Sequence, residues 1–241
     1  MIFAAGIGSR LMPLTSKCPK ALIPVNGLPM LQLIIQRIKK LGINHIVINT
    51  YHHSDKVKEF IQKNSFSMKI DSSEESIQLL NTGGGLKKAS LILDANEPIL
   101  IHNVDVFTDI NLQKMINFHK ETNAIATLAV RNRKTNRYLL FDESNRLIGW
   151  KNNKSKERIL IRKEHNINNF AFSGIHIVHP SIFPLLPSKE VFSIIEAYLD
   201  IAKHHSICGY EHNEGTWIDA GKKEFLEPAS NFVKSHKSLY F

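Results

Sequence analysis

The residues best suited to chemistry lie in one short segment near the start of the chain. A brief apolar run, residues 1–5, breaks into Gly6-x-Gly8-x-Arg10, and Lys20 follows ten residues later. Glycines lack a Cβ atom, so the backbone N–H groups of this turn can approach an anion closely. Arg10 can bind phosphate oxygens through two parallel hydrogen bonds, and Lys20 adds a point charge. Together these residues predict a ligand with several phosphates.

Two common phosphate-binding motifs do not fit this segment. The spacing of the P-loop, G-x-x-x-x-G-K-[ST], is absent, and the third glycine of the dinucleotide-binding motif is missing because Leu11 follows Arg10. The alternative is a plain strand-to-helix turn. That alternative must also account for Pro13, Pro19 and Lys20, so we favour phosphate binding.

Two aspartates each follow an apolar run that is typical of a strand. Asp105 ends the run at residues 99–104, and Asp219 ends the short run Trp217-Ile218 before Ala220-Gly221. Carboxylate oxygens suit Mg²⁺, which takes one or two carboxylates together with phosphate oxygens and water. Each aspartate alone could equally cap a helix or a turn. As a pair they predict a two-carboxylate magnesium site.

Three consecutive glycines at the start of a predicted helix form another unusual segment. The chain reads Asn81-Thr82-Gly83-Gly84-Gly85, and glycines in a helix cost conformational entropy. A base or ribose packed against the backbone would explain them. A flexible loop is the alternative.

The elements that must position these residues alternate between strand and helix in the first half of the chain. Strands are expected at residues 1–5, 45–50, 68–70 and 98–102, and helices at 29–41, 54–64, 82–93 and 111–121. Ser54 is expected to cap the second helix, and Thr82 to cap or precede the third. This alternation predicts a mostly parallel sheet with helices on both faces.

Strand patterns dominate the second half, at residues 124–130, 137–141, 146–150, 171–178 and 217–219, with a helix at 191–203. We expect one domain over residues 1–241, in which the half at about 123–241 extends the sheet of the half at about 1–122. The second half then builds the other wall of a cleft. Ligands of open α/β sheets bind at the carboxyl ends of the strands, where Gly6, Gly83 and Asp105 are expected.

The composition indicates an ordinary globular protein. The 241 residues are 43% hydrophobic, which allows a full core. No apolar run reaches the roughly 18 residues of a membrane span, and no signal peptide is visible. The two cysteines, Cys18 and Cys208, are expected to be free thiols, so a cytoplasmic location is expected without membrane partners.

The net charge of +9 is concentrated in one segment. Residues 131–169 hold eleven lysines and arginines against four acidic residues, a net charge of +7. Three explanations remain open: a solvated surface, a field that steers a small polyanion, and a nucleic-acid site. We favour the solvated surface and place nucleic acid last.

The pattern from Ala4 to Thr15, with Gly6, Gly8, Arg10 and Pro13, followed by Pro19-Lys20, resembles the signature of sugar-phosphate nucleotidyltransferases. Asp105 and the segment at residues 217–221 resemble the two magnesium-binding segments of that family. Thr82-Gly83-Gly84-Gly85 and Phe172-Ser173-Gly174-Ile175 are most similar to a short bacterial branch. That branch includes N-acetylmuramate α-1-phosphate uridylyltransferase and mannose- and heptose-1-phosphate guanylyltransferases.

The resemblance implies a Rossmann-like nucleotide-diphospho-sugar transferase fold and a Mg²⁺-dependent reaction. An NTP and a sugar 1-phosphate would give an NDP-sugar, for cell-wall or surface-glycan synthesis, and pyrophosphate. It implies that residues 1–122 bind the nucleotide and residues 123–241 the sugar. The implied roles are catalysis by Arg10 and Lys20; nucleotide binding by Ala5, Gly6, Gly8, Ser9, Arg10, Thr82, Gly83 and Gly84; sugar binding by Asn103, Ser173 and Gly174; and Mg²⁺ binding by Asp105 and Asp219. A homo-oligomer remains possible.

This chain departs from the family pattern at two positions near the expected site. Val104 stands where relatives usually have glycine, and Asn81 stands where the muramate enzymes often have glutamate. Our first expectation is uridylyl transfer to N-acetylmuramate 1-phosphate, and the alternative is guanylyl transfer to mannose or heptose 1-phosphate. A regulatory homologue that binds nucleotide sugars without catalysis, supported by Val104, is a further alternative.

Overall fold

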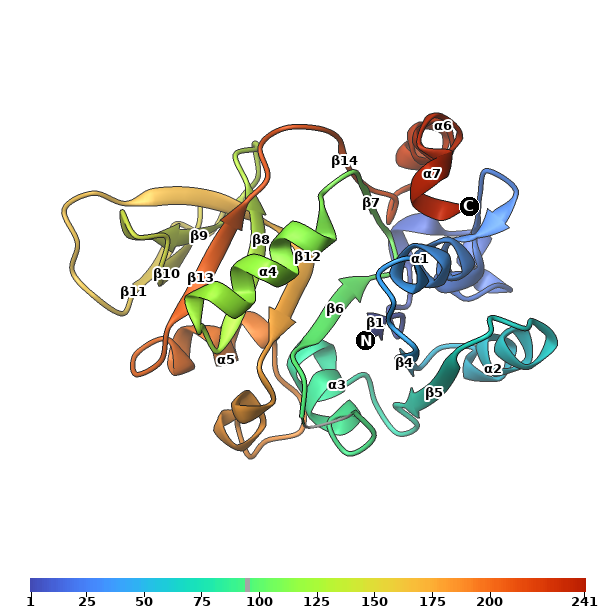
Figure 1. Ribbon diagram of the computed structural model, residues 1–241, viewed down its shortest axis with the longest axis horizontal. Helices are drawn as coiled ribbons and strands as arrows, with labels where there is room; N and C mark the ends of the chain where they lie inside the picture. The colour runs from blue at the N-terminus through green and yellow to red at the C-terminus, as the bar shows by residue number, and fades with distance from the viewer. Residues whose placement is uncertain (94–95) are drawn as a thin grey trace.

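Strands and helices alternate through the first half of the chain, and strands dominate the second half (Figure 1). The computed structural model describes residues 1–93 and 96–241. The strands are β1 (Ile2–Phe3), β2 (Pro24–Val25), β3 (Leu28–Pro29), β4 (His45–Thr50), β5 (Lys69–Glu74), β6 (Ile99–Asn103), β7 (Val106–Thr108), β8 (Ala126–Arg131), β9 (Arg137–Phe141), β10 (Leu147–Asn152), β11 (Glu157–Leu160), β12 (Asn168–Val178), β13 (Ile207–Glu211) and β14 (Trp217–Asp219). The helices are α1 (Met30–Lys39), α2 (Ser54–Lys63), α3 (Asn81–Ala89), α4 (Leu112–Thr122), α5 (Ile194–Ile201), α6 (Leu226–Ser235) and α7 (Lys237–Tyr240), with short 3₁₀ turns η1 (Ser9–Leu11), η2 (Leu14–Ser16), η3 (Lys20–Leu22), η4 (Pro180–Leu185) and η5 (Lys223–Phe225).

The central sheet confirms the expected mixed α/β architecture. Its strand order is β11-β10-β9-β12-β6-β1-β4-β5, and β8 pairs with both β12 and β13. The strands β5, β4, β1 and β6 run parallel, whereas β12 runs antiparallel to β6, β8 and β9. The parallel order therefore belongs to the first half, and the second half adds mainly antiparallel strands.

The register of the three central strands brings their carboxyl ends to one edge. Phe3 of β1 pairs with Asn49 of β4 on one side and with Asn103 of β6 on the other. The turns that follow these strands therefore start side by side, as the rule for open α/β sheets predicts.

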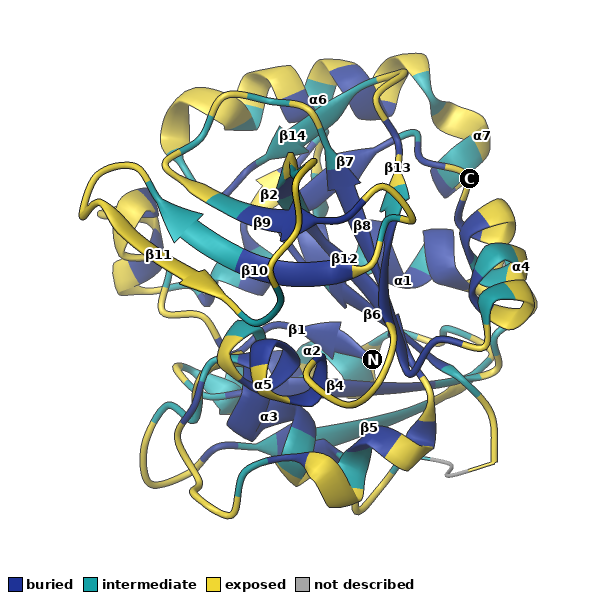
Figure 2. Ribbon diagram, turned by 90° about the vertical axis from the view of Figure 1, so that its left-hand side faces the viewer, coloured by how far each residue is buried: buried dark blue, intermediate teal, exposed yellow. Residues whose placement is uncertain are grey.

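Alternation along the strands supplies one hydrophobic core on each face of the sheet. Ile46 and Ile48 pack into the core beneath α1, α6 and α7, whereas Val47 between them packs into the core beneath α3 and α5. The central strands are buried, while β11 and the outer sides of the helices are exposed (Figure 2). Burial on both faces fixes the sheet and thereby the edge where its parallel strands end.

Two expected helix caps are wrong. His53, with φ of 55°, precedes α2, and the Ser54 hydroxyl bonds the Glu74 carboxylate instead of a helix N–H. Helix α3 begins at Asn81, so Thr82 lies in its first turn, where its hydroxyl accepts a hydrogen bond from the Ile194 N–H at 3.0 Å. In both cases the hydroxyl forms a hydrogen bond with a residue distant in the sequence instead of the helix N–H that local capping rules predict.

Two expectations from composition agree with the described residues. Cys18 and Cys208 are free thiols. Within residues 1–93 and 96–241, no helix has both the length and the hydropathy that a membrane crossing requires.

Candidate functional site

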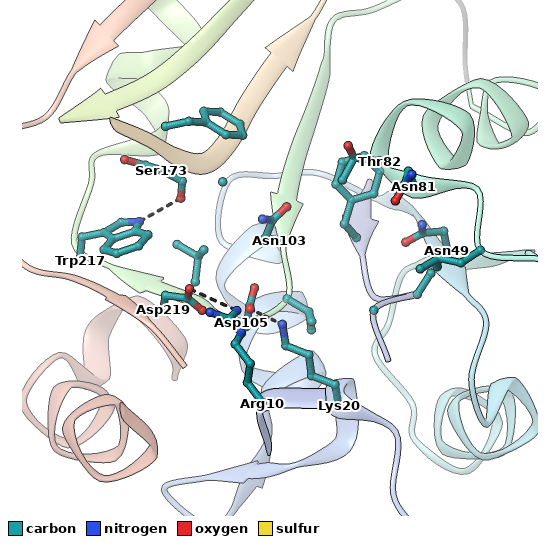
Figure 3. Close-up of a pocket in the computed structure, with 18 of the residues that line it drawn as sticks. Arg10, Lys20, Asn49, Asn81, Thr82, Asn103, Asp105, Ser173, Trp217 and Asp219 are labelled. Carbon is teal, nitrogen blue, oxygen red and sulfur yellow. Dashed lines mark hydrogen bonds and ion pairs between the residues drawn. The ribbon is translucent and has the colours of Figure 1, made fainter. Parts of the chain in front are cut away.

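A cavity of about 420 Å³ opens where the parallel strands end (Figure 3). Its walls come from the ends of β1, β4 and β6, from the first turn of α3, from the middle of β12 and from β14. The lining residues are Phe3, Ala5, Gly6, Arg10, Lys20, Asn49, Glu75, Leu79, Asn81, Thr82, Asn103, Val104, Asp105, Val106, Arg133, Phe172, Ser173, Gly174, Trp217 and Asp219. Both halves of the chain therefore contribute to one pocket.

In the turn after β1, Gly6 lines the pocket, whereas Gly8 packs against Thr15 and Lys20. Gly8 has φ of 71°, and a Cβ atom on it would stand 2.8 Å from Thr15 Cγ2 and 3.0 Å from Lys20 Cβ. The Thr15 hydroxyl donates to the Gly8 carbonyl at 2.9 Å. Gly8 thus permits the tight packing that places the Lys20 stem, which is a reason for glycine other than direct contact with an anion.

Two cations and two carboxylates meet at the floor of the pocket. Lys20 Nζ forms an ion pair with Asp105 Oδ2, and Arg10 Nη2 lies 3.6 Å from Asp219 Oδ2. A Cβ atom on Gly221 would stand 2.7 Å from a carboxylate oxygen of each aspartate and 2.8 Å from Arg10 Nη2. The glycine leaves room for Arg10 and the two aspartates, which converge with Lys20 at this point (Figure 3).

The two carboxylates differ in their affinity for protons. Burial opposes ionisation of Asp105, but the charge and hydrogen bond of Lys20 outweigh burial and lower the pKa of Asp105. Burial and the neighbouring Asp105 charge raise the pKa of Asp219. Two carboxylates that share a site are expected to separate in this way, because the second negative charge is disfavoured beside the first.

The donor set at this point fits Mg²⁺. Asp105 and Asp219 supply two hard carboxylate ligands on one side of an open cavity, which leaves the remaining positions for phosphate oxygens and water. Among the described residues, no group of three or more His, Cys, Asp or Glu side chains could hold a metal by itself. The twelve histidines therefore form no all-protein metal cluster in that part of the chain.

The wall opposite the cations is built by β12 and β14. Trp217 Nε1 donates to the Ser173 carbonyl at 2.9 Å, and the Ser173 hydroxyl is 2.7 Å from His212 Nε2. Gly174 has φ of 76°, and a Cβ atom on it would stand 2.7 Å from Asn103 Nδ2. The structure thus brings Asn103, Ser173 and Gly174 together on this wall.

The third side of the pocket rests on a buried carboxylate that sequence reasoning missed. Glu75 is 2% exposed, and it accepts hydrogen bonds from Asn49 Nδ2 at 2.7 Å and from the Leu80 N–H at 2.8 Å. Asn49 Oδ1 in turn accepts from the Ala4 N–H at 2.8 Å. Burial raises the pKa of Glu75. Asn49 lies one residue before the end of β4 and Glu75 directly follows β5, so only the pairing of these two strands reveals that their side chains meet.

The glycines of α3 are required by packing within the chain, and nucleotide binding by Gly83 and Gly84 stays a prediction. A Cβ atom on Gly83 would overlap the Phe192 ring, and one on Gly84 would overlap the Glu190 carbonyl. The Gly83 N–H donates to the Phe192 carbonyl at 3.0 Å. These glycines allow α3 to pack against residues 190–192, so the pocket is lined by Asn81 and Thr82 before them.

The predicted site residues fall into two groups, those that line the pocket and those that do not. Ala5, Gly6, Arg10, Lys20, Thr82, Asn103, Asp105, Ser173, Gly174 and Asp219 line the pocket, whereas Gly8, Ser9, Gly83 and Gly84 do not. Val104 and Asn81, the two departures from the family pattern, both line it.

One residue of the basic segment is part of the pocket and not of a solvated surface. Arg133 follows β8, and its guanidinium carbon stacks 4.1 Å from the centre of the Trp217 ring. The other basic residues of this segment lie mainly on β9, β10 and β11 and the connecting turns, where exposure dominates. No local signal separates Arg133 from its basic neighbours.

The known proteins that this chain resembles in sequence are nucleotidyltransferases. A family model described as nucleotidyl transferase matches residues 1–236. The chain is 28% identical, over 98% of its length, to a mannose-1-phosphate guanyltransferase of Yarrowia lipolytica. It is 25% identical, again over 98%, to the catalytic subunit beta of mannose-1-phosphate guanylyltransferase from Xenopus tropicalis. It spans 64% of the length of both relatives.

Solved structures share the fold. HddC from Yersinia pseudotuberculosis, complexed with GMP-PN, superposes with a TM-score of 0.74 at 19% identity, covering 95% of this chain and 96% of that one. A UDP-glucose pyrophosphorylase complexed with UDP-glucose superposes with a TM-score of 0.76 at 18% identity, covering 97% of both chains. These likenesses confirm the expected nucleotidyltransferase fold.

Proposed function

Because the chain belongs to the nucleotidyl transferase family, we propose that its pocket transfers a nucleotidyl group from an NTP to a sugar 1-phosphate. The products are an NDP-sugar and pyrophosphate. The observation that carries this proposal is the convergence of Arg10, Lys20, Asp105 and Asp219 in one cavity at the carboxyl edge of the sheet.

For this reaction the protein must position the two substrates and stabilise the negative charge of their phosphates. An oxygen of the sugar phosphate attacks the α-phosphorus in line, and pyrophosphate leaves on the opposite side, so no protein nucleophile is required. Preorganised cations stabilise the charge that develops on the phosphoryl oxygens. A pocket floor with two cations suits this demand.

The positions of the four side chains support the roles that we propose for them. Arg10 is half-exposed, with 53% of its side chain accessible, and is proposed to bind the departing β- and γ-phosphates. Lys20 is 14% accessible, and is proposed to hold the α-phosphate and the attacking phosphate. Asp105 and Asp219 are proposed to hold Mg²⁺, which would neutralise charge on the phosphate oxygens. Substrate binding must then exchange the ion pairs within the protein for contacts with phosphate and metal.

For the base and the sugar, the curated relatives favour the alternative over our first expectation. We propose guanylyl transfer to mannose 1-phosphate as the leading pair, since both relatives carry that activity in their names. Uridylyl transfer to N-acetylmuramate 1-phosphate stays a prediction in second place. Asn81, Thr82 and Asn49 line the side of the pocket where a base would lie.

The test is a matrix of four NTPs against mannose, heptose, glucose and N-acetylmuramate 1-phosphates, with Mg²⁺, read by pyrophosphate release. The expected result is turnover that is highest for GTP with mannose 1-phosphate. Nucleotide binding without pyrophosphate release in any pair would contradict the proposal and favour a non-catalytic homologue.

A further inference from the structure

Arg133 is a cation of the pocket wall that the roles proposed above leave unused. Its Nη2 donates to the Phe172 carbonyl at 3.1 Å, and its guanidinium stacks on Trp217. The stack and the hydrogen bond hold the planar group in one orientation. Arg133 is therefore fixed in place, unlike a surface arginine that moves freely in solvent.

The charge of Arg133 is not neutralised by an ion pair within the described residues. Lys20 pairs with Asp105 and Arg10 approaches Asp219, but no carboxylate in residues 1–93 or 96–241 is in ion-pair contact with Arg133. Its Nε, which is buried, also has no hydrogen-bond partner in that part of the chain. A fixed cation without a counter-ion at a pocket wall suits an anionic ligand.

The position of Arg133 indicates which anion that is. Its anchors, Trp217 and the Phe172 carbonyl, belong to the wall that contains Ser173, and this wall lies across the two aspartates from Arg10 and Lys20 (Figure 3). Asp219 is near enough for its charge to act on Arg133. A phosphate bound between Arg133 and the aspartates would therefore lie beside the wall of β12 and β14, where the sugar is expected.

A second cavity supports an anionic ligand on this side. It has a volume of about 690 Å³ and shares Arg10, Arg133, Trp217 and Asp219 with the first cavity. Its other basic residues are Lys134, Arg137 and Lys222, and its lining contains a single acid, Asp219. The entrance next to Arg133 thus has an excess of positive charge, which attracts polyanions.

We propose that Arg133 binds the phosphate of the sugar 1-phosphate and positions it for attack on the α-phosphorus. This inference rests on the proposed function and assigns it a substrate-binding residue in the second half of the chain. Trp217 acts as a positioning residue, because its ring fixes the plane of the guanidinium.

The test compares Arg133→Gln, Arg133→Lys and a charge control, Arg158→Gln, in steady-state kinetics with each substrate varied in turn. Arg158 lies on the exposed strand β11, outside both cavities. We expect Arg133→Gln to raise the KM for the sugar 1-phosphate about 10- to 100-fold, which is typical for loss of a charged hydrogen bond. The KM of the same variant for the NTP should differ from the parent value by less than about twofold.

The conservative variant and the control sharpen the result. Arg133→Lys retains the charge but not the planar group, so it should recover part of the affinity, and Arg158→Gln should match the parent. The melting temperatures of the variants are measured alongside. An increased KM for the NTP alone, or for pyrophosphate alone in the reverse reaction, would overturn the proposal.

A binding measurement separates this inference from the proposed function. Calorimetry measures mannose 1-phosphate binding to the parent, Arg133→Gln and Arg133→Lys proteins, each loaded with a non-hydrolysable GTP analogue. Weaker binding in Arg133→Gln supports the inference even if no substrate pair turns over, which would refute only the proposed reaction. Equal binding in all three proteins would overturn the role of Arg133.

Discussion

At the floor of the pocket Arg10 and Lys20 pair with carboxylates, whereas on the α3 side Glu75 accepts hydrogen bonds from Asn49 and the Leu80 N–H. The ion pairs at the floor must open before phosphates and a metal can bind. The hydrogen bonds around Glu75 are buried and internal, so they can persist through the reaction. The floor is therefore arranged for exchange of partners, and the α3 side for a fixed shape.

This difference predicts that substitutions at the floor reduce activity and leave stability intact, while substitutions on the α3 side mainly reduce stability. Three variants test the contrast, from the largest expected effect to the smallest, and a fourth variant tests the pH dependence of stability.

Asp219→Asn should reduce turnover by about 100- to 1,000-fold, because it removes one of two carboxylates proposed to hold the metal. The melting temperature should stay the same or rise, since burial and the neighbouring Asp105 charge already raise the pKa of Asp219. Pyrophosphate release and thermal melting measure the two effects. Near-parental turnover would remove Asp219 from the metal site.

Gly84→Ala should lower the free energy of unfolding by about 1–3 kcal/mol, because its Cβ would overlap the Glu190 carbonyl. The matched control is Gly6→Ala, whose Cβ would meet only Lys20 Cδ, at 4.0 Å. Urea unfolding of both variants gives the comparison. Equal stability of the two variants would show that packing does not explain the glycines of α3.

Glu75→Gln should cost about 1–2 kcal/mol of stability, because one of its two acceptors becomes a donor that faces Asn49 Nδ2 or the Leu80 N–H. The loss shifts the first turn of α3, so the KM for the NTP should rise while the KM for the sugar phosphate stays constant. Substitution of Glu74, which lies on the surface next to Lys58, by Gln is the control. A selective effect on the sugar phosphate would contradict the division of the pocket.

Acid should destabilise the protein through His119 of α4, which is buried and hydrogen-bonded to the Thr127 hydroxyl. Burial, followed by the His179 charge, lowers the pKa of His119 to about 4, whereas the unfolded value is about 6.5. The unfolded state therefore binds the proton first, and stability is lost as the pH falls from 6.5 towards 4. His119→Gln should reduce this slope by at most about 1.4 kcal/mol per pH unit, measured by urea unfolding. If the free energy of unfolding of His119→Gln depended on pH as steeply as that of the parent, the lowered pKa of His119 would be contradicted.

Local sequence was sufficient wherever a residue's role depends on its near neighbours. The turn with Gly6 and Arg10, the strand that ends before Asp105 and the strand that ends at Asp219 could all be read from apolar runs and turn residues. Of the ten predicted site residues that line the pocket, Asn103, Ser173 and Gly174 were named only through the family resemblance. Arg133, Asn49 and Glu75 were missed, since an arginine after a strand or a polar residue at a strand end has no distinctive local pattern.

The three glycines of α3 mark the limit of that reading. Glycine reports that something lies close to the backbone, but the sequence does not say whether it is a ligand or another part of the chain. Here it is Phe192 and Glu190, more than one hundred residues away.

The sequence by itself determined the alternating elements, the phosphate-binding turn and the two aspartates, because strand periodicity and glycine turns are short-range properties. Only the tertiary structure decided which side chains share the pocket. The pairing of β4 with β5 brings the Asn49 side chain within hydrogen-bond distance of Glu75. The hydrogen bond between Trp217 of β14 and Ser173 of β12 holds the ring against which Arg133 stacks. Those contacts depend on long-range pairing of strands, which no window of the sequence contains.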